Sequence, residues 1–552
     1  MSDKKAQEII QVQKQMEEVR EPRESVWQDI IDYILPGLDD LLQQTQPGGR
    51  TGTDVYDGTG ISALQLFADG LFGYLVSPAI AWFRLRMARP ELNEIHEIRE
   101  WLQAVEQHLY VTFARSNWYD AMSTYFEYGG AVGTAALYSE EDLDEARIVY
   151  TVPHPGEIYI AENRYGRVSR VHRKVRLEAH KAVEMFNDNV SPGLRDSAGS
   201  SPYARWEFIH AVYPRRNRDA SKKDARNKRF ASVWVEVAQE KIARESGYDM
   251  NPYGVWRFKR GTTPYGISPA EDALVEVMGL NEIGKSLLGA AQLAVEPAYN
   301  VPAEMQGNVR IKPRGMNYYD DDRRVISPVH TGINYPIGVD REQDKRKAVE
   351  KHFRVEFFTL LANIQGRNLT ATEVIEMQGE KAAVLARPIN RLNNECLDPQ
   401  IDRAFQIELN AGRLPEPPDI LYELGGEEID VDYMGPLAQA QKRLFEQQGY
   451  QHGLNSVTPF AQLRPEVLDI IDFDESARAI LQTHGFPQKA IRPREVVDKL
   501  RQARARAQAQ ETQKEDLLNM AGGVKTLAEA DRASEGALSQ ALAAAQQGEE
   551  ME

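Results

Sequence analysis

The sequence predicts an α+β protein that is mainly helical, with an antiparallel β section inserted between helical blocks. Apolar residues recur at helical spacing over residues 1–140 and again over residues 267–297, 341–361 and 370–412. Between residues 146 and 262 the apolar period changes to two, as in half-buried strands. From Val496 onward the composition narrows to Ala, Gln, Glu and Arg, which predicts a helical or loosely ordered tail.

Composition limits the functional classes. At 552 residues the chain is long enough for two to four domains. Its net charge of −17 argues against a protein that grips nucleic acid over its whole surface, but suits one that touches DNA without holding it. The single cysteine, Cys396, excludes an intrachain disulfide and suits a reducing compartment. We interpret it as a small buried residue on a helix.

The N-terminal block begins with a charged helix. Its first 18 residues contain no apolar core, so no signal peptide is expected. The helix should end at Pro36-Gly37. Its expected apolar stripe consists of Val12, Met16, Val19, Trp27, Ile30, Ile31 and Ile34. A further amphipathic helix is predicted over Glu94–Ser116.

The most apolar run of the chain is Ile61–Phe83. Asp69 interrupts it, and the uncharged part, Gly70–Phe83, has only 14 residues. That length is too short to span a bilayer. We therefore predict a buried helix and turn, and no contact with a membrane.

The β section contains two predicted hairpins. The first turns near Asn163–Gly166. The second hairpin pairs Trp206–Tyr213 with Phe230–Glu240. The basic loop Pro214–Arg229 connects its strands and contains eight Lys or Arg and only two Asp. Such a loop is ordinarily exposed to solvent without a partner. The functional alternative is that it contacts DNA or an acidic partner. Its candidate contact residues are Arg215, Arg216, Arg218, Lys222 and Lys223. The loop lacks the interleaved aromatic residues of a single-strand binder.

A long helix is predicted over Ile267–Pro297, followed by short extended pieces and turns over residues 298–339. Within that helix, Gly279–Ser286 (GLNEIGKS) fits the phosphate-binding pattern G-x-x-x-x-G-K-[ST]. The pattern requires a strand, a loop and then a helix, whereas here the helical stripe passes through the motif without a change of phase. We interpret the match as coincidence, and retain as an alternative a nucleotide-driven motor that uses Lys285 and Ser286.

A polar loop, Asn363–Leu369, separates a helix over Arg341–Leu361 from a long interrupted helix. Thr370 and Glu373 have the spacing of a capping box that starts the second helix. A loop anchored so firmly and filled with amides is predicted to face a partner. Its candidate contact residues are Asn363, Gln365, Arg367 and Asn368.

The long helix should be interrupted twice. Pro388 is expected to kink it, because proline removes one helical hydrogen bond. Asp398-Pro399 has the residues of a fresh N-cap and first helical position, and the segment should stop near Gly412. One more short strand is predicted within residues 418–432, and helices with turns over residues 436–484.

No motif indicates catalysis. The histidines show no metal-ligand spacing and no nucleophile elbow is present. The sequence therefore predicts no metal, no cofactor and no enzymatic activity.

With these elements in order, the chain resembles the portal (head-to-tail connector) proteins of podovirus-type tailed bacteriophages. The resemblance covers most of residues 20–440, and its motifs are specific only when taken together. They are YDGTGISALQLFADGLFGYLVSP, NWYDAMSTYFEYGGAVGTAALYSEED, EIYIAENRYGRVSRVHRK, PYGISPAEDAL, NLTATEVIEMQGEKAAVLARPINRL, PPDILYE and YMGPLAQAQK.

The resemblance implies a division of the chain into named parts. These parts are a wing (1–267, with its β section at 146–262), a first stem helix (268–297), a clip (298–339), a second stem helix (340–361), a channel or tunnel loop (362–369), a kinked long helix (370–412), a wing strand and connection (413–435), a crown (436–495) and a C-terminal barrel or tail (496–552).

The resemblance also implies a function. It is a ring of twelve subunits at one capsid vertex, through which double-stranded DNA is packaged and ejected. Implied partners are the terminase, the major capsid and scaffolding proteins and the tail adaptors, with the protein in the virion and, during assembly, in the host cytoplasm. Besides the nucleotide-driven motor, a capsid or tail scaffold without a channel remains an alternative.

Overall fold

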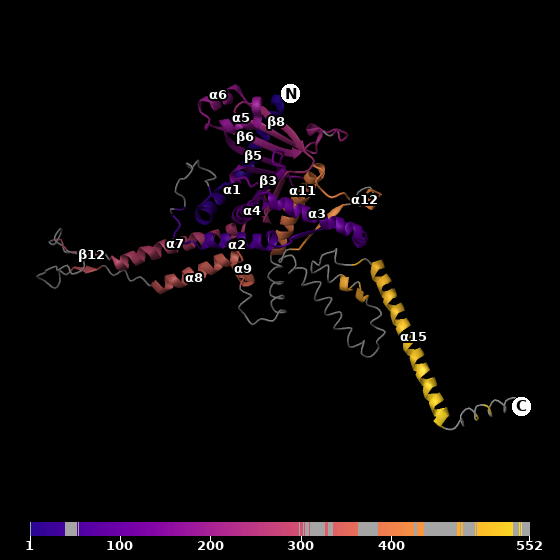
Figure 1. Cartoon of the computed structure of the whole chain (residues 1–552). Helices are drawn as coiled ribbons and strands as arrows, with labels where there is room; N and C mark the ends of the chain where they lie inside the picture. Colours follow the sequence, from indigo (N-terminus) through magenta and orange to yellow (C-terminus); the bar gives the residue numbers. More distant parts are fainter. Residues whose placement is uncertain are drawn as a thin grey trace. The chain divides into compact units, whose positions relative to one another are not determined.

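The computed structural model describes residues 2–38, 54–222, 224–296, 298–301, 326–328, 335–362, 385–423, 428–434, 472–474, 476–478 and 494–533, with isolated positions between and beyond these ranges. The chain divides into two compact units, residues 1–89 with 101–463 and residues 90–100 with 464–552. The first unit combines helices with antiparallel sheets, which confirms the mixed α+β prediction (Figure 1).

Helix α1 (Ser2–Ile34) opens the first unit and buries the predicted stripe from Trp27 to Ile34. Before Trp27, Met16 is buried as predicted, whereas Val19 is 45% exposed and Arg20 is buried in its place. The Arg20 guanidinium lies 3.8 Å from the centre of the Tyr159 ring, and its Nη1 donates to backbone carbonyls of residues 156 and 158. These partners lie far away in the sequence, so the local apolar pattern could not predict the burial of Arg20.

The apolar run forms the buried helix α2 (Thr59–Leu75), as predicted. It packs against α4 (Trp118–Val132), and α3 (His96–Arg115) lies between them in the chain. Two strands complete this part of the first unit. Strand β1 (Phe83–Met87) was not predicted, and it pairs antiparallel with β14 (Ile429–Tyr433), which confirms the expected late strand.

Two antiparallel sheets form the β section, with strand orders β3-β2-β9 and β4-β5-β6-β7-β8. The strands are β2 (Thr134–Asp142), β3 (Arg147–Thr151), β4 (Ile158–Glu162), β5 (Val168–Glu178), β6 (Arg205–Pro214), β7 (Phe230–Glu236), β8 (Lys241–Tyr248) and β9 (Tyr253–Arg257). Both predicted hairpins, β4–β5 and β6–β7, are confirmed. The section starts earlier than expected, because Gly133 (φ +76°) ends α4 and turns the chain directly into β2.

Helices cover both faces of the five-stranded sheet. On one face α5 (Ala179–Phe186) and α6 (Pro192–Ser200) bury Phe208 and Trp234. On the other face α1 contributes Ala6 and Ile9 to a second cluster. The prediction of strands alone over residues 146–262 was therefore incomplete. A start signal for α6 was present in the sequence: Ser191 accepts a hydrogen bond from the Leu194 amide and a proline follows it.

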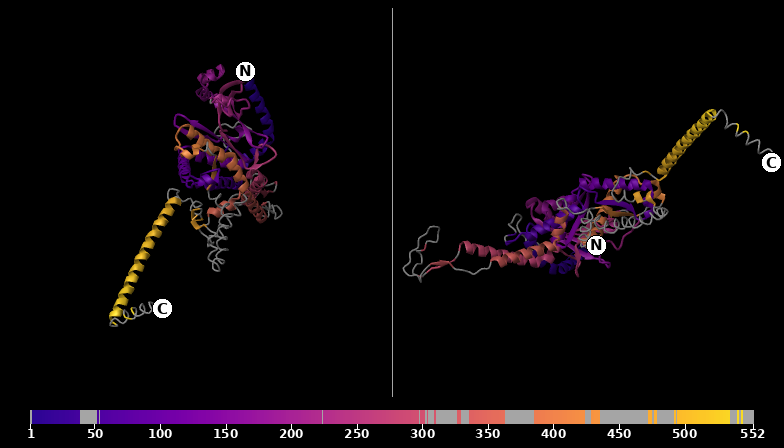
Figure 2. Two further views of the ribbon diagram at one scale, coloured as in Figure 1. Left: turned by 90° about the vertical axis from the view of Figure 1, so that its right-hand side faces the viewer. Right: turned by 90° about the horizontal axis from the view of Figure 1, so that it is seen from below.

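Helices α7 (Pro269–Val295) and α8 (Tyr335–His352) run side by side (Figure 1 and Figure 2). α7 confirms the predicted long helix. Beyond its end, β12 (Tyr299–Asn300) pairs with β13 (Ser327–Pro328), which agrees with short extended pieces there. α8 starts at Tyr335, five residues before the expected second stem helix, and the helical path resumes as α9 (Val355–Ala362). The short strands β10 (Lys259–Arg260) and β11 (Gly266–Ile267) precede α7.

The later long helix is described from residue 385 and continues to Asn410. A π-helical turn, Asn393–Leu397, leads directly into α11 (Asp398–Asn410). Asp398 has helical dihedral angles (φ −55°, ψ −53°), so the predicted fresh N-cap is wrong. The π turn moves the hydrogen-bond ladder by one residue, because the Asp398 amide bonds to the carbonyl of Asn393, and the helix continues through Pro399. Gly412 (φ +67°) marks the predicted end.

Two further α-helices are α12 (Asp419–Glu423) in the first unit and α15 (Arg494–Ala533) in the second. Of the two forms expected for the tail, helical or loosely ordered, the structure shows a helix over Arg494–Ala533. Most of residues 436–495, predicted as helices with turns, lie outside the described residues. None of the described helices is long and apolar enough to cross a membrane.

Two buried histidines occupy opposite faces of the five-stranded sheet. His210 stacks on Trp234 with ring centroids 4.3 Å apart and contacts the Tyr253 hydroxyl and Ser232 Oγ at 3.1 and 2.9 Å. His172 contacts Gln13 Oε1 at 3.1 Å. Burial lowers the pKa of each to about 3, and neighbouring arginine charges add to the shift.

We therefore expect stability to fall as the pH drops from about 6.5, the ordinary histidine value, toward 3, because the unfolded chain binds protons that the folded chain excludes. Each histidine contributes a slope of up to about 1.4 kcal/mol per pH unit in that window. Urea unfolding at several pH values measures the slope. His210→Gln should reduce it, whereas His180→Gln, at a partly exposed position, should not; equal slopes in all three proteins would contradict the assignment.

Candidate functional site

The predicted contact loop lies in residues 363–384, outside the described residues. This segment contains Asn363, Gln365, Arg367 and Asn368 and the capping pair Thr370 and Glu373. The chain on both sides of it is described. The candidate site is therefore built from the two structures that hold the ends of residues 363–384.

Aromatic packing holds the upstream end. Phe358 of α9 lies with its ring centroid 6.0 Å from that of Phe67 and 6.3 Å from that of Tyr74, both on α2. Gly70 of α2 is needed for this approach, because a methyl group on its Cα would overlap the Phe358 ring. Phe358 is 2% exposed, so the first turn of α9 is seated in the core of the first unit.

A break between α8 and α9 makes this packing possible. Arg354 has φ +58°, in the left-handed region, so the continuous helix predicted over Arg341–Leu361 is wrong. Phe353 and Phe358 both contact Phe67, at 6.3 and 6.0 Å between ring centroids. In one continuous helix, residues five apart point about 140° away from each other, so both rings could not face the same neighbour. Tertiary packing has overridden the local helical preference here.

Polar contacts hold the downstream end. The Trp256 indole Nε1 donates to the carbonyl of Pro388 at 3.1 Å. Gly254 lies under the π turn, where a Cβ would stand 2.9 Å from Cys396 Sγ. Cys396 is thus a buried packing residue, as predicted, and burial raises the pKa of its thiol to about 12. The helix that leaves residue 384 is docked onto β9 through these contacts.

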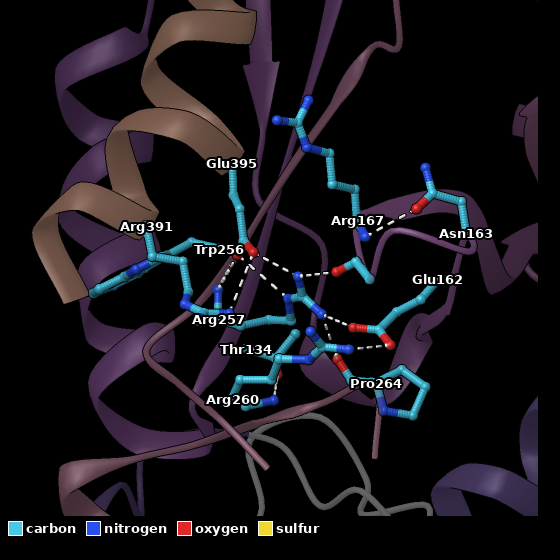
Figure 3. Close-up of polar contacts among 12 residues, drawn as sticks. Thr134, Glu162, Asn163, Arg167, Trp256, Arg257, Arg260, Pro264, Arg391 and Glu395 are labelled. Carbon is cyan, nitrogen blue, oxygen red and sulfur yellow. Dashed lines mark hydrogen bonds and ion pairs between the residues drawn. The ribbon is translucent and has the colours of Figure 1, made fainter. Parts of the chain in front are cut away.

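Arg257 is the centre of the downstream anchor (Figure 3). Its side chain is 1% exposed and forms ion pairs with Glu395 of the π turn and Glu162 of β4. Nη2 also donates to the Gly166 carbonyl at 3.0 Å, and the Arg257 amide donates to Glu395 Oε2 at 3.1 Å. Burial opposes the charged guanidinium, but the hydrogen bonds and charges of the two glutamates outweigh it and raise the Arg257 pKa.

Arg403 of α11 makes a second buried contact to the same sheet. Its Nε donates to Ser139 Oγ at 2.9 Å and its Nη2 to the Ser139 carbonyl at 3.1 Å, while its guanidinium lies 4.8 Å from the centre of the Tyr248 ring. Neither Arg257 nor Arg403 was singled out in the sequence. Arginine is ordinarily exposed, and the glutamate and serine partners are distant in the chain, so no local signal identified them.

The five predicted contact residues of the basic loop between β6 and β7 differ in their surroundings. Arg215 is structural: its side chain is 10% exposed and bonds Glu245 Oε1 at 3.1 Å and the Ser246 carbonyl at 2.7 Å. Arg216 and Arg218 are exposed, and so is Lys222, which lies 3.7 Å from Asp219 Oδ2. Lys223 lies outside the described residues.

Gly279–Ser286 lies in the middle of α7, where its amides belong to the helix. Asn281 in this stretch bonds the backbone of residues 54 and 56, and Lys285 lies 5.8 Å from the centre of the Tyr56 ring. Helical amides cannot point inward to cradle a phosphate. The motif is therefore a coincidence, and the alternative of a motor built on Lys285 and Ser286 is not supported. Within the described ranges, no group of three acidic, histidine or cysteine side chains is placed to hold a metal ion.

Comparison with known proteins identifies relatives of the whole chain. The model of the bacteriophage head to tail connecting protein family matches residues 6–491. The portal protein of Salmonella phage epsilon15 is 30% identical over 563 aligned positions that cover 98% of each chain. The probable portal protein of Bordetella phage BPP-1 is 31% identical over 523 positions that cover 92% of each chain.

Removing Glu395 should weaken the downstream anchor. Glu395→Ala leaves the buried Arg257 with one carboxylate, and we expect a loss of about 3 kcal/mol in the free energy of unfolding. Arg391→Ala is the matched control, because the Arg391 side chain is 30% exposed and lies 3.5 Å from the same carboxylate. It should cost less than about 1 kcal/mol. Urea unfolding measures both values; equal losses would show that Arg257 does not depend on Glu395.

Two glycines of α2 provide a test of the upstream anchor. Gly70→Ala should cost roughly 2 kcal/mol, because the added methyl group displaces Phe358. Gly73→Ala should stabilise the protein by up to about 1 kcal/mol, since nothing lies within 4 Å and alanine favours the helix. Thermal unfolding of both variants should give shifts of opposite sign; stabilisation by Gly70→Ala would contradict the packing.

Proposed function

The chain belongs to the bacteriophage head to tail connecting protein family, and we infer that it is the portal through which phage DNA enters and leaves the capsid. It is a capsid-associated structural connector of the virion rather than an enzyme. The single observation that carries this function is the match along nearly the whole chain, 98% of it for the epsilon15 portal protein.

For the assembly we propose a ring of twelve subunits at one capsid vertex. The terminase supplies the energy for packaging, and capsid, scaffolding and tail adaptor proteins contact the ring. In this proposal α7 is the first stem helix, α8 and α9 form the second, and residues 363–369 face the channel. The support is the order of the elements: a long helix, short extended strands, a second helical stretch and a later long helix follow one another as the family resemblance implies.

The net charge fits a conduit. Duplex DNA carries about one charge per 1.7 Å of its axis, and a surface that makes six to ten phosphate contacts binds it tightly. A ring of chains that each carry −17 repels DNA overall. We propose that Asn363, Gln365 and Asn368 offer neutral hydrogen-bonding groups, and that Arg367 adds one basic contact per subunit. Such a loop contacts the phosphates and resists back-slip without locking the DNA.

The two anchors support this role. The upstream end of residues 363–384 is held by Phe358 on α2, and the downstream end by Trp256 and Arg257 on β9. Both ends are therefore fixed to the same compact unit. A segment held in this way can meet a passing duplex while the ring keeps its form.

Replacing Arg367 and Asn368 by Ala together should leave ring assembly intact and reduce the fraction of particles that retain packaged DNA. Negative-stain images of the purified parent and variant should show closed rings with a central hole; monomers or filaments in the parent would contradict the portal assignment. Retained DNA per particle is the second measurement, with Arg367→Lys as the control that keeps the charge and should retain DNA like the parent. If the double variant retains as much DNA as the parent, the proposed role of this loop is wrong.

A further inference from the structure

The loop between β6 and β7, residues 215–229, is a concentration of positive charge on an acidic chain. Eight of its fifteen residues are Lys or Arg and two are Asp, whereas the whole protein carries −17. We call residues 215–229 the cationic loop. The loop is thus basic although the chain as a whole is acidic, and the overall composition does not explain this difference.

Hydrogen bonds join the two arms of the cationic loop. The Arg215 amide donates to the Arg229 carbonyl at 2.9 Å and closes the base of the loop. Farther out, the Asp219 amide donates to Asn227 Oδ1 at 3.0 Å and joins the two arms. The short turn Ala225–Asn227 rests on Gly247 of β8, where a Cβ would stand 2.8 Å from the Phe230 carbonyl and overlap that of Ala225. The cations are therefore presented on a preformed scaffold.

The loop uses its own acidic residues internally. Asp219 Oδ1 accepts from the Ser221 amide and hydroxyl at 3.1 and 2.6 Å, and Asp224 Oδ1 accepts from Asn227 Nδ2 at 2.7 Å. Hydrogen bonds from Ser221 lower the Asp219 pKa. Lys222 pairs with Asp219 as described, and Lys228 lies 3.0 Å from Asp249. This leaves Arg216, Arg218 and Arg226 exposed, with no ion pair to any residue that the structure describes.

The character of these residues indicates the ligand. An arginine guanidinium presents a planar fork of donors that matches a phosphate group. The cationic loop contains no large apolar residue, whereas protein interfaces are usually built around apolar or aromatic anchors. The rings at its base are already engaged, because Arg170 lies 4.5 Å from the centre of the Tyr213 ring and Arg229 lies 5.7 Å from that of Phe230. Stacking on unpaired bases is thus disfavoured.

We propose that the cationic loop binds the phosphate backbone of double-stranded DNA without reading its sequence, as a contact separate from residues 363–369. The choice of DNA over an acidic protein rests partly on the proposed function, which brings duplex DNA to this protein. Arg216, Arg218 and Arg226 carry the contact, and Arg215 positions the loop. Because the rest of the chain is acidic, the binding is weak and steeply dependent on salt.

The test measures binding of the full-length chain to a labelled random-sequence duplex by fluorescence anisotropy over a salt series. The loop variant is Arg216→Ala with Arg218→Ala and Arg226→Ala. The control carries Arg164→Ala, Arg167→Ala and Lys181→Ala, which remove the same charge at exposed positions outside the loop. Loss of three phosphate contacts should lower the slope of log affinity against log salt by about 3 and weaken low-salt binding at least about tenfold. The control should change both much less.

Two outcomes would overturn the proposal. In the first, the loop variant and the control lose DNA binding equally, which is the behaviour of net charge alone. In the second, the loop variant binds duplex like the parent but loses binding to polyglutamate, which assigns the loop to an acidic protein. Negative-stain images of the parent in the same preparation test the portal assignment separately. If the parent forms rings, loss of this proposal leaves the portal function intact.

Discussion

The buried charge of Arg257 is the constraint on which the rest of the first unit depends. A guanidinium that is 1% exposed is stable only if its donors are satisfied, and the required acceptors come from two distant parts of the chain: Glu162 and Gly166 of the β4–β5 hairpin, and Glu395 of the π turn. Both sheets and the later long helix are thereby brought to one point (Figure 3). Removal of one partner from such a network is costly, because it leaves a buried charge without compensation.

The two ends of residues 363–384 are held by different kinds of interaction. Upstream, Phe358 rests on Gly70 through non-directional packing. Downstream, Trp256 and Arg257 bind through hydrogen bonds and charge, which are directional. Packing tolerates small displacements of a helix, whereas a hydrogen-bonded guanidinium sets the orientation of its partner. The described chain on the two sides of residues 363–384 is therefore docked by shape upstream and by oriented donors downstream.

Local chemistry was enough to predict much of the fold. The β4–β5 hairpin followed from period-two alternation and a turn rich in Asn and Gly, and α7 followed from an unbroken apolar stripe. Prediction failed where distant neighbours outweighed local preference. The sequence around Arg354 favours a continuous helix, but the helix breaks at Arg354. The break allows Phe353 and Phe358 to pack on the same residue, Phe67. Asp398-Pro399 resembles a helix start, but a π turn carries the helix through it.

By itself the sequence determined the mixed helical and antiparallel classes, the family resemblance and the polar character of residues 363–369, because these depend on periodicity, composition and motif order. Only the tertiary structure decided which charges are available. Arg20, Arg257 and Arg403 are buried and Arg215 is held by Glu245, while Arg216 and Arg218 remain exposed. A charged side chain is buried only where its partners converge in space, and apart from Glu24, which pairs with Arg20, the partners of these arginines lie tens to hundreds of residues away.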